Sequence, residues 1–323
     1  MSDVKKTFLL AVVGSTASGK SRMAVRLAQE LNGEVISCDS MQIYRRMNIG
    51  TAKPTVDEME EIPHHLIDFA DPNVSFSSAD YVAAAKQAIE DVSSRGKLPI
   101  LCGGTGLYLE RLLYGGGDAE EAEPSDEIRQ KWQTYCEENG NHALHERLRE
   151  VDAESADAIH ENNVHRVIRA LEIFETTGIP KSEWDKQSKE KESDYAFCVV
   201  GLRYGSRELL YDRINRRVDA MMESGLLEET ESLLEEGVFV RNSTAAQAIG
   251  YKELLAYFGG EESLDEAVER LKTATRRYAK RQITWFSAKP YVRWVDADAE
   301  GRMRAEEEIL SDILARIEDA KNH

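Results

Sequence analysis

The sequence predicts an α/β fold in which a mostly parallel sheet is covered by helices on both faces. Three short apolar runs, residues 7–13, 34–38 and 98–102, have the length and composition of buried strands. A glycine-rich turn follows the first run, and segments with a helical spacing of apolar residues separate the three. Strands that alternate with helices favour parallel pairing, because the connecting helices then cover the faces of the sheet.

The individual elements follow in chain order. Strands are expected at residues 7–13, 34–38, 98–102, 197–202 and 291–295. Helices are expected at residues 22–31, 79–93, 211–236 and 263–285, where apolar residues recur at helical spacing.

The pattern changes after three consecutive glycines at 115–117. Residues 128–177 are helical and polar in pattern, with no convincing strand, and residues 186–194 are charged and poor in apolar side chains, which is typical of a loop. We interpret residues 118–196 as an all-helical insertion. The α/β core is then formed by residues 1–117 and 197–323.

Composition narrows the class of protein. No apolar run approaches the roughly 20 residues that span a bilayer, and nothing indicates export, so we expect a cytoplasmic protein. The four cysteines lie far apart without a metal-binding spacing, which favours buried reduced thiols (Cys38, Cys102, Cys136 and Cys198) over zinc or disulfides. The net charge of −18 argues against a nucleic-acid partner unless positive charge is concentrated locally.

A phosphate-binding loop lies between the first predicted strand and the first predicted helix. It consists of Gly14, Ser15, Thr16, Ala17, Ser18, Gly19, Lys20 and Ser21, and fits GxxxxGK[ST]. The glycines let several backbone N–H groups point at one anion, and the helix start adds partial positive charge. Lys20 would neutralise a terminal phosphate, and the Ser21 hydroxyl could hold Mg²⁺. The loop predicts a diphosphate or triphosphate ligand, without requiring ATP.

Further segments resemble the tRNA dimethylallyltransferases (isopentenyltransferases), of the bacterial type. The matching segments are CDSMQIY at 38–44, GTAKP at 50–54, GGTGLY at 103–108, RVIRALE at 166–172, AIGYKE at 248–253 and KRQITW at 280–285. Together with the phosphate loop they occur in the family's order over about residues 8–286. Two departures are Ser15, where proline is usual, and the segment 161–163, where a Pro-Asn-Asp-like run is typical.

The resemblance implies a prenyl transfer to RNA. Dimethylallyl diphosphate would occupy the phosphate loop, and N6 of adenosine 37 in the tRNA anticodon loop would attack its allylic carbon. Asp39 resembles the family's general base, with a turn-forming or magnesium-linked Asp as the alternative. Thr105 resembles the donor to the bridging oxygen of the leaving group, with a helix N-cap as a compatible alternative.

An arginine is expected to clamp the diphosphate. Arg217 resembles the family's clamp, because a guanidinium fork suits phosphate oxygens. Arg213 lies four residues earlier on the same helical face and is an alternative. For Arg216 a solvated charged face is the better interpretation.

Positive charge is concentrated locally, as a nucleic-acid partner requires in a chain with this negative net charge. Residues 273–289 contain five basic residues, three aromatic ones and no acid, which suits phosphate contacts and base stacking. The residues expected to contact tRNA, several of them by the resemblance alone, are Asp39, Ser40, Met41, Gln42, Thr105, Arg129, Arg166, Gln247, Gly250, Tyr251, Lys252, Arg276, Arg277, Lys280 and Arg281. The helical insertion would grip the anticodon stem of a monomeric enzyme.

Three other functions remain open at this stage. A small-molecule P-loop kinase would need an acidic residue after the strand at 98–102, where the chain has glycines. A relative that prenylates free AMP or ADP would need neither the insertion nor the basic helix. A non-catalytic RNA or nucleotide binder would keep its whole activity without Asp39. His64 and His65 are expected to be packed or hydrogen-bonded, because adjacent strand residues rarely share one metal ion.

Overall fold

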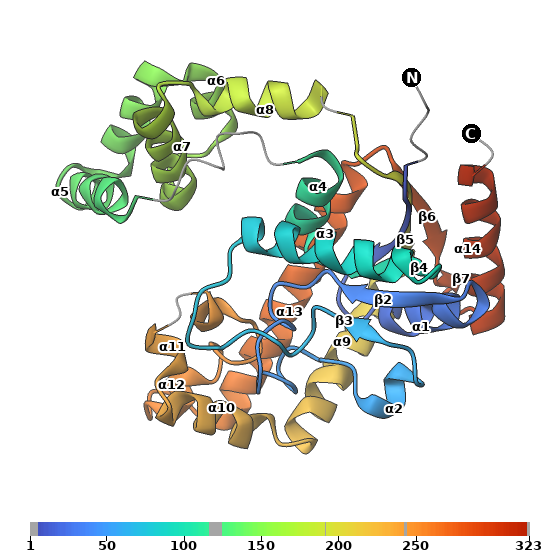
Figure 1. Ribbon diagram of the computed structural model, residues 1–323. Coiled ribbons are helices and arrows are strands. Elements are labelled where there is room, and N and C mark those ends of the chain that lie inside the picture. The colour runs from blue at the N-terminus through green and yellow to red at the C-terminus, as the bar shows by residue number, and fades with distance from the viewer. Residues whose placement is uncertain (1–5, 116–124, 191, 242–243, 322–323) are drawn as a thin grey trace, which may run out of the picture. The chain divides into compact units, whose positions relative to one another are not determined.

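The computed structural model of the protein describes residues 6–115, 125–190, 192–241 and 244–321 (Figure 1). The chain divides into two compact units. The first contains the residues up to Leu109 and those from Tyr195 onward, and the second spans Glu110–Asp194. The predicted insertion boundary at residue 118 lies outside the described residues. Helix α4 (Gly106–Tyr114) runs across the observed boundary, so the helical part starts earlier than 118.

The first unit is built on a six-stranded sheet with the order β3-β2-β4-β1-β5-β6. Every neighbouring pair in this sheet is parallel. The strands are β1 (Phe8–Gly14), β2 (Gly33–Ser37), β3 (His64–His65), β4 (Leu98–Gly103), β5 (Ala196–Arg203) and β6 (Val292–Asp296). A separate antiparallel pair joins β7 (Asp298–Ala299) to β8 (Arg302–Met303). The predicted α/β class with a mostly parallel sheet is therefore confirmed.

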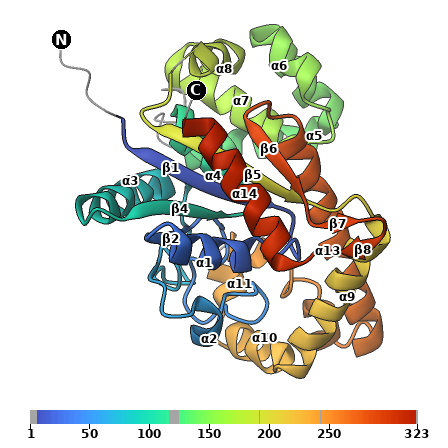
Figure 2. The same cartoon turned by 90° about the vertical axis from the view of Figure 1, so that its right-hand side faces the viewer.

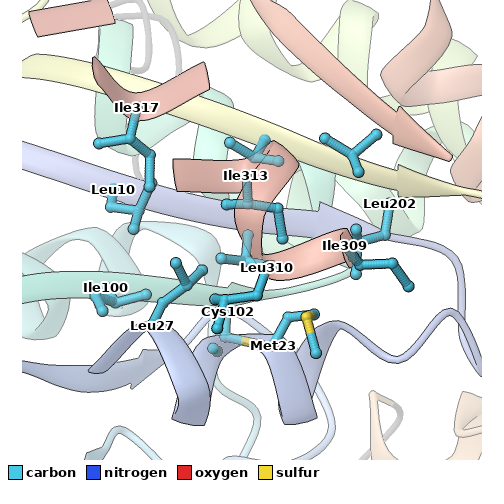
Figure 3. Packing of buried hydrophobic residues seen from close by; sticks show 14 of the residues in the cluster. Leu10, Met23, Leu27, Ile100, Cys102, Leu202, Ile309, Leu310, Ile313 and Ile317 are labelled. Carbon is cyan, nitrogen blue, oxygen red and sulfur yellow. The ribbon is translucent and has the colours of Figure 1, made fainter. Parts of the chain in front are cut away.

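Helices cover both faces of this sheet. One face carries α1 (Lys20–Glu30) and α14 (Glu306–Lys321), and Figure 2 shows α14 lying across the strands. In the core between them, strand residues such as Leu10 and Leu202 meet Ile309, Ile313 and their neighbours on α14 (Figure 3). The other face packs against α3 (Ser78–Ser94). This arrangement explains why β1 and β4 read as continuous apolar runs.

The remaining helices of the first unit surround a second core. They are α9 (Arg207–Glu223), α10 (Leu226–Glu235), α11 (Val238–Arg241), α12 (Leu255–Phe258) and α13 (Leu264–Ser287), with a 3₁₀ turn at Ala245–Gln247. The segment after β2 packs against them through buried residues that include Ile43 and Tyr44. The short helix α2 (Val56–Met59) has no buried residue and lies outside this core. The helix predicted at 211–236 is two helices, because Gly225 adopts a positive φ of 96° that ends the first of them.

The second unit is helical in its described part. Its helices are α5 (Asp126–Val151), kinked at Gly140, α6 (Ala153–Ala158), α7 (Val164–Thr177) and α8 (Lys181–Glu190). The prediction of a loop from 186 onward was wrong for residues 186–190. This end of α8 is polar, and ion pairs one turn apart, Lys181 with Asp185 and Lys186 with Glu183, support the helix from its surface.

Two expectations from composition are also met. All four cysteines are buried free thiols. Among the described residues no helix is both long and apolar enough to cross a bilayer.

A buried carboxylate in β2 makes folding stability depend on pH. Glu34 accepts hydrogen bonds from the Arg95 guanidinium and from His65, and these lower its pKa to about 2. The stabilisation is present above the ordinary pKa of a glutamate and is lost as pH falls toward 2. We expect the free energy of unfolding to drop by about 3 kcal/mol between about pH 4.5 and 2, measured by urea denaturation. Glu34→Gln should flatten this dependence, whereas replacing the exposed Glu30 by Gln should preserve it.

Candidate functional site

The phosphate loop begins where β1 ends and stops where α1 starts. Gly19 caps α1 in the left-handed region, with a φ of 91°, and Ala17 also has a positive φ of 60°. This curled backbone leaves the first N–H groups of α1 without helical acceptors, so that they are available to an anion. The Lys20 ammonium lies 3.3 Å from the Ser15 carbonyl oxygen, folded back over the loop.

Lys20 and Arg217 are two cations held close to this loop. Desolvation lowers the pKa of both groups, and Asp39 opposes the change. Repulsion from Arg217 lowers the pKa of Lys20 further, and repulsion from Arg213 does the same to Arg217. Within the described part of the chain, neither has an ion-pair partner. Both line a cavity of about 540 Å³ that also contains Ser21. Desolvated cations without a protein counter-ion favour binding of an anionic ligand.

The three arginines of α9 differ in their hydrogen-bond partners and in their exposure. Arg213 donates through Nε to the Ala17 carbonyl oxygen at 3.0 Å and also lines this cavity. Arg217 contacts the Ala52 carbonyl oxygen at 3.5 Å and lines this cavity as well as a second, smaller one. Arg216 is exposed and pairs with Asp212 at 2.9 Å. The geometry therefore favours Arg217 over Arg213 as the clamp, and Arg216 has the solvated position expected of it.

Asp39 follows the end of β2. Its Oδ1 accepts the backbone N–H groups of Met41 at 2.9 Å and Gln42 at 3.3 Å, which fixes the orientation of the carboxylate. Its Oδ2 makes no hydrogen bond to any described residue, and the side chain lines a cavity. One oxygen is thus anchored while the other remains able to accept a proton. The turn-forming and basic roles considered for this residue are compatible.

Thr105 lies beside Asp39, although β4 delivers it from elsewhere in the chain. Its Oγ1 accepts the N–H of Ser40 at 3.0 Å, and its own N–H donates to the Cys38 carbonyl at 3.2 Å. The hydroxyl oxygen therefore holds the residue next to Asp39. Thr105 also directly precedes α4, and its carbonyl oxygen accepts the N–H of Leu109 at 3.4 Å, so the residue stands at the N-cap position as well. The Thr105 hydroxyl in turn donates to the Ser40 hydroxyl oxygen over 3.4 Å, a long hydrogen bond that leaves the proton able to turn to a closer acceptor.

A second cavity, of about 220 Å³, joins these groups. Lys20 and Arg217 form one end of its lining, and Asp39 to Gln42 form another part. Apolar side chains make up much of the remaining wall: Met41, Val218, Met221, Ala248, Ile249 and Leu271. The two cavities share Lys20, Ser21, Ala52, Arg217 and Met221. A ligand with an anionic head and a small apolar tail matches this lining.

Two residues that hold the site together were not expected from the sequence. Glu229 on α10 accepts the N–H groups of Asn48, Ile49 and Gly50, and so fixes the loop that leads to Ala52. Gln282 on α13 bridges the phosphate loop and the loop before Thr105. Neither has a local signal, because their partners lie far away in sequence. Gln282 does fall inside the KRQITW match, which gave no role for it.

The expected contact of Tyr251 with RNA does not fit its position. Tyr251 is fully buried, and its hydroxyl donates to Glu229 at 2.6 Å. Its ring lies over Gly50, where a Cβ would come within 2.5 Å of the ring. We therefore assign Tyr251 to holding the loop around Gly50. Gly250 is buried as well, whereas Gln247 is exposed and Lys252 is partly exposed.

Helix α13 presents a basic surface. Arg277, Lys280 and Arg281 are exposed and lie on one face, since they are spaced by three and four residues. No described residue forms an ion pair with any of the three. Arg281 also lies over the Tyr278 ring and lines the smaller cavity. Arg276 differs, because it donates to Asn215 at 2.6 Å.

The second unit contains two arginines that were predicted to contact tRNA, and only one of them is already held in an ion pair with a described residue. Arg129 pairs at 2.9 Å with Glu172, a fully buried carboxylate that also binds Arg169. Arg129 is therefore engaged in holding its own unit together. Arg166 is exposed on α7 and has no partner among the described residues.

The protein oxygens of this site suit Mg²⁺ if phosphate and water supply the other ligands of the ion. No group of three or more His, Cys, Asp and Glu ligands exists within the described residues. The exposed Ser21 hydroxyl lines both cavities, and Mg²⁺ commonly combines one or two protein oxygens with phosphates and water. Ser21 thus fits an ion that arrives with a diphosphate. His64 and His65 bind the Ile62 carbonyl and Glu34 respectively, as expected for hydrogen-bonded histidines.

Comparisons with known proteins agree with this site. A family model described as IPP transferase matches residues 42–289. The tRNA dimethylallyltransferase of Caldanaerobacter subterraneus subsp. tengcongensis is 50% identical over 291 residues, which cover 90% of this chain and 92% of that protein. The tRNA dimethylallyltransferase of Bacillus cytotoxicus is 49% identical over 323 residues, the full length of both chains.

Solved structures show the same likeness. The full-length tRNA isopentenylpyrophosphate transferase from Bacillus halodurans matches with a TM-score of 0.70 and 43% identity, covering 98% of this chain and 99% of that one. A eukaryotic dimethylallyltransferase acting on tRNA matches with a TM-score of 0.80 and 30% identity, covering 97% of this chain and 80% of the other.

Proposed function

The chain belongs to the IPP transferase family, and from this premise we propose how its own residues prenylate RNA. It is an enzyme that attaches a dimethylallyl group to tRNA. We assign dimethylallyl diphosphate as the donor and N6 of adenosine 37 in the anticodon loop as the acceptor. The observation that carries this assignment is the pair of desolvated cations, Lys20 and Arg217, beside a partly apolar cavity that contains Asp39.

The phosphate loop binds the diphosphate of the donor. Backbone N–H groups at the start of α1, Lys20 and the Arg217 fork would share the negative charge. The five-carbon tail then extends along Met221 and Val218 into the smaller cavity. ATP could use the same loop through its phosphates, but the apolar side chains of the smaller cavity suit a prenyl tail.

The chemical step exchanges one bond for another. The lone pair of the adenine N6 forms a bond to the allylic carbon, while the carbon–oxygen bond to the diphosphate breaks and its electrons leave with the diphosphate. The free Oδ2 of Asp39 accepts the proton that N6 loses. The anchored Oδ1 keeps this oxygen directed toward the cavity.

Thr105 stabilises the leaving group. Charge develops on the bridging oxygen as the bond to carbon breaks, so a donor at that point acts mainly in the transition state. Its hydroxyl proton would turn to the bridging oxygen from the Ser40 hydroxyl, to which it donates over 3.4 Å. Mg²⁺, held by Ser21 and the phosphates, would supply further neutralisation of the diphosphate.

The acceptor RNA is bound by the basic face of α13. Arg277, Lys280 and Arg281 would contact phosphates, with Arg281 nearest to the cavity. The adenine has to leave the base stack to reach Asp39. Arg166 of the second unit is proposed to contact the same RNA. We further propose that the enzyme acts as a monomer in the cytoplasm.

Neutralising this face should weaken RNA binding. Replacing Arg277, Lys280 and Arg281 together by Gln is expected to reduce the magnitude of the slope of log K against log salt by about 2, at ~0.7 per contact for single strands. Fluorescence anisotropy of a labelled anticodon stem-loop at several salt concentrations measures this slope. As a control, Gln at Arg302 and Arg316, which are exposed outside α13, should leave the slope unchanged. An unchanged slope in the triple variant would place the RNA elsewhere.

The proposed function is tested by mass spectrometry of a tRNA digest after incubation with dimethylallyl diphosphate and Mg²⁺. One adenosine should gain a C5H8 unit, and diphosphate should be released in equal amount. AMP and ADP are offered as competing acceptors, which tests for a prenyltransferase of free nucleotides. ATP is offered as a competing donor together with metabolite acceptors, which tests for a small-molecule kinase. Turnover of ATP without any change in the anticodon adenosine would contradict the proposal.

A further inference from the structure

Gln282 is a buried amide that connects two loops of the active site. It lies on α13 with 4% of its surface exposed. Its Oε1 accepts the backbone N–H of Thr16 in the phosphate loop at 2.8 Å. Its Nε2 donates to the Gly104 carbonyl oxygen at 3.1 Å. Both ends of the amide are therefore satisfied by backbone groups from two different strand ends.

The two partners need a side chain that accepts at one end and donates at the other. A carboxylate would accept at both ends and face the Gly104 carbonyl without a proton. An apolar side chain would leave a buried N–H and a buried carbonyl without partners, which is costly. A Cβ at position 104 would lie 2.0 Å from Nε2 of Gln282, so a larger residue than glycine there would displace the amide.

The bridge lies between groups with different tasks in the proposed reaction. On one side, Thr16 belongs to the loop that would bind the diphosphate. On the other side, Gly104 precedes Thr105, whose hydroxyl holds the backbone next to Asp39. The same helix exposes Arg277, Lys280 and Arg281 to the RNA. One side chain thus connects donor site, leaving-group donor and RNA-binding helix.

We propose that Gln282 is a positioning residue that sets the distance between the phosphate loop and Thr105. The inference rests on the function proposed above. The bridging oxygen of the donor has to be within reach of the Thr105 hydroxyl while its phosphates occupy the loop. A displacement of about 1 Å in such a geometry lowers the rate by about 10²-fold.

If Gln282 is a positioning residue, its loss should lower kcat and leave substrate binding nearly unchanged. Without the bridge, Lys20 and Arg217 still bind the diphosphate, and α13 still presents its cations. The KM values for donor and RNA should therefore change less than threefold, an order-of-magnitude limit, while kcat falls by about 10²-fold. A residue that only stabilised the fold would change the fraction of folded enzyme, with kcat per folded molecule preserved.

Two substitutions test the proposal, Gln282→Glu and Gln282→Met. A protonated glutamic acid can accept from Thr16 and donate to Gly104, as the amide does, whereas its carboxylate cannot. Because burial raises the pKa of a carboxyl group, protonation should fall within the assay range. The ratio of variant to wild-type kcat is expected to rise at least about tenfold from about pH 9 to 6 for Glu. The ratio for Met should stay low throughout.

The assay is single-turnover prenylation of an anticodon stem-loop, referred to the folded fraction measured by circular dichroism in the same buffers. Gln87→Met, at an exposed position on α3, is the matched control and should behave as wild type. Equal rates for wild type and both variants, or a Glu ratio that does not change with pH, would overturn the inference. If the Met variant does not fold, the Glu ratio decides alone. Failure of wild type to prenylate the RNA would instead overturn the proposed function.

Discussion

Asp39→Asn should reduce the rate of prenyl transfer by about 10³-fold while leaving RNA binding intact, because a general base contributes about 10²–10⁴-fold to such a step. Asparagine retains the carbonyl oxygen that accepts the N–H groups of Met41 and Gln42, so the turn should persist. The oxygen that faces the cavity becomes an amide nitrogen, which cannot take a proton from the adenine. Single-turnover rates and stem-loop binding, measured side by side, separate the two effects.

A matched control exists in the same unit. Asp71 makes an equivalent turn, in which its Oδ1 accepts the N–H of Asn73 at 2.9 Å, but it lies outside both cavities. Asp71→Asn should leave rate and binding unchanged. If Asp39→Asn retained a rate near that of wild type, another group would have to be the base. Loss of RNA binding in that variant would show that Asp39 acts through the shape of its loop.

The second large effect is expected from Arg217→Gln. Removing one desolvated cation from the diphosphate site should lower kcat/KM for the donor by about 10²–10³-fold, because Arg217 would bind charge that grows as the diphosphate leaves. The KM for RNA should not change. Steady-state kinetics with each substrate varied in turn measures this separation.

The other two arginines of α9 provide graded controls. Arg213→Gln should lower kcat/KM by about tenfold, because it loses one hydrogen bond to the phosphate loop at a position that lines only the larger of the two cavities. Arg216→Gln should have no effect, since Arg216 is exposed and pairs with Asp212. A larger loss for Arg213 than for Arg217 would contradict the assignment of the clamp.

The sequence was most informative where local chemistry decides the structure. The phosphate loop, the strand before it and the helix after it follow from glycine positions and apolar periodicity within about twenty residues. Asp39 and Thr105 could be placed at the ends of parallel strands, and the structure brings them together through Ser40. A continuous helix at 211–236 was a wrong prediction, because Gly225 interrupts an otherwise periodic segment.

What the sequence could not reveal depends on pairs of distant residues. Glu229 and Gln282 look like ordinary polar helix residues, and only tertiary structure shows the backbone groups that they bind. Tyr251 was expected at the RNA because it belongs to the matching segment at 248–253, but its side chain is buried in the core. Periodicity assigns a residue to a face of its helix, but it does not identify the residues that this face contacts.

Gly50 and Gly250 meet backbone to backbone, and this contact restricts how the protein can vary. A Cβ at Gly250 would come within 2.8 Å of the Gly50 carbonyl oxygen, and Gly250 also has a φ of 115°. A Cβ at Gly50 would run into Tyr251. Neither position can therefore mutate alone without prising two segments apart, and a compensating change at the other cannot restore the gap. In a saturation library, both glycine codons should remain invariant among active clones, because both residues are buried where the two segments meet.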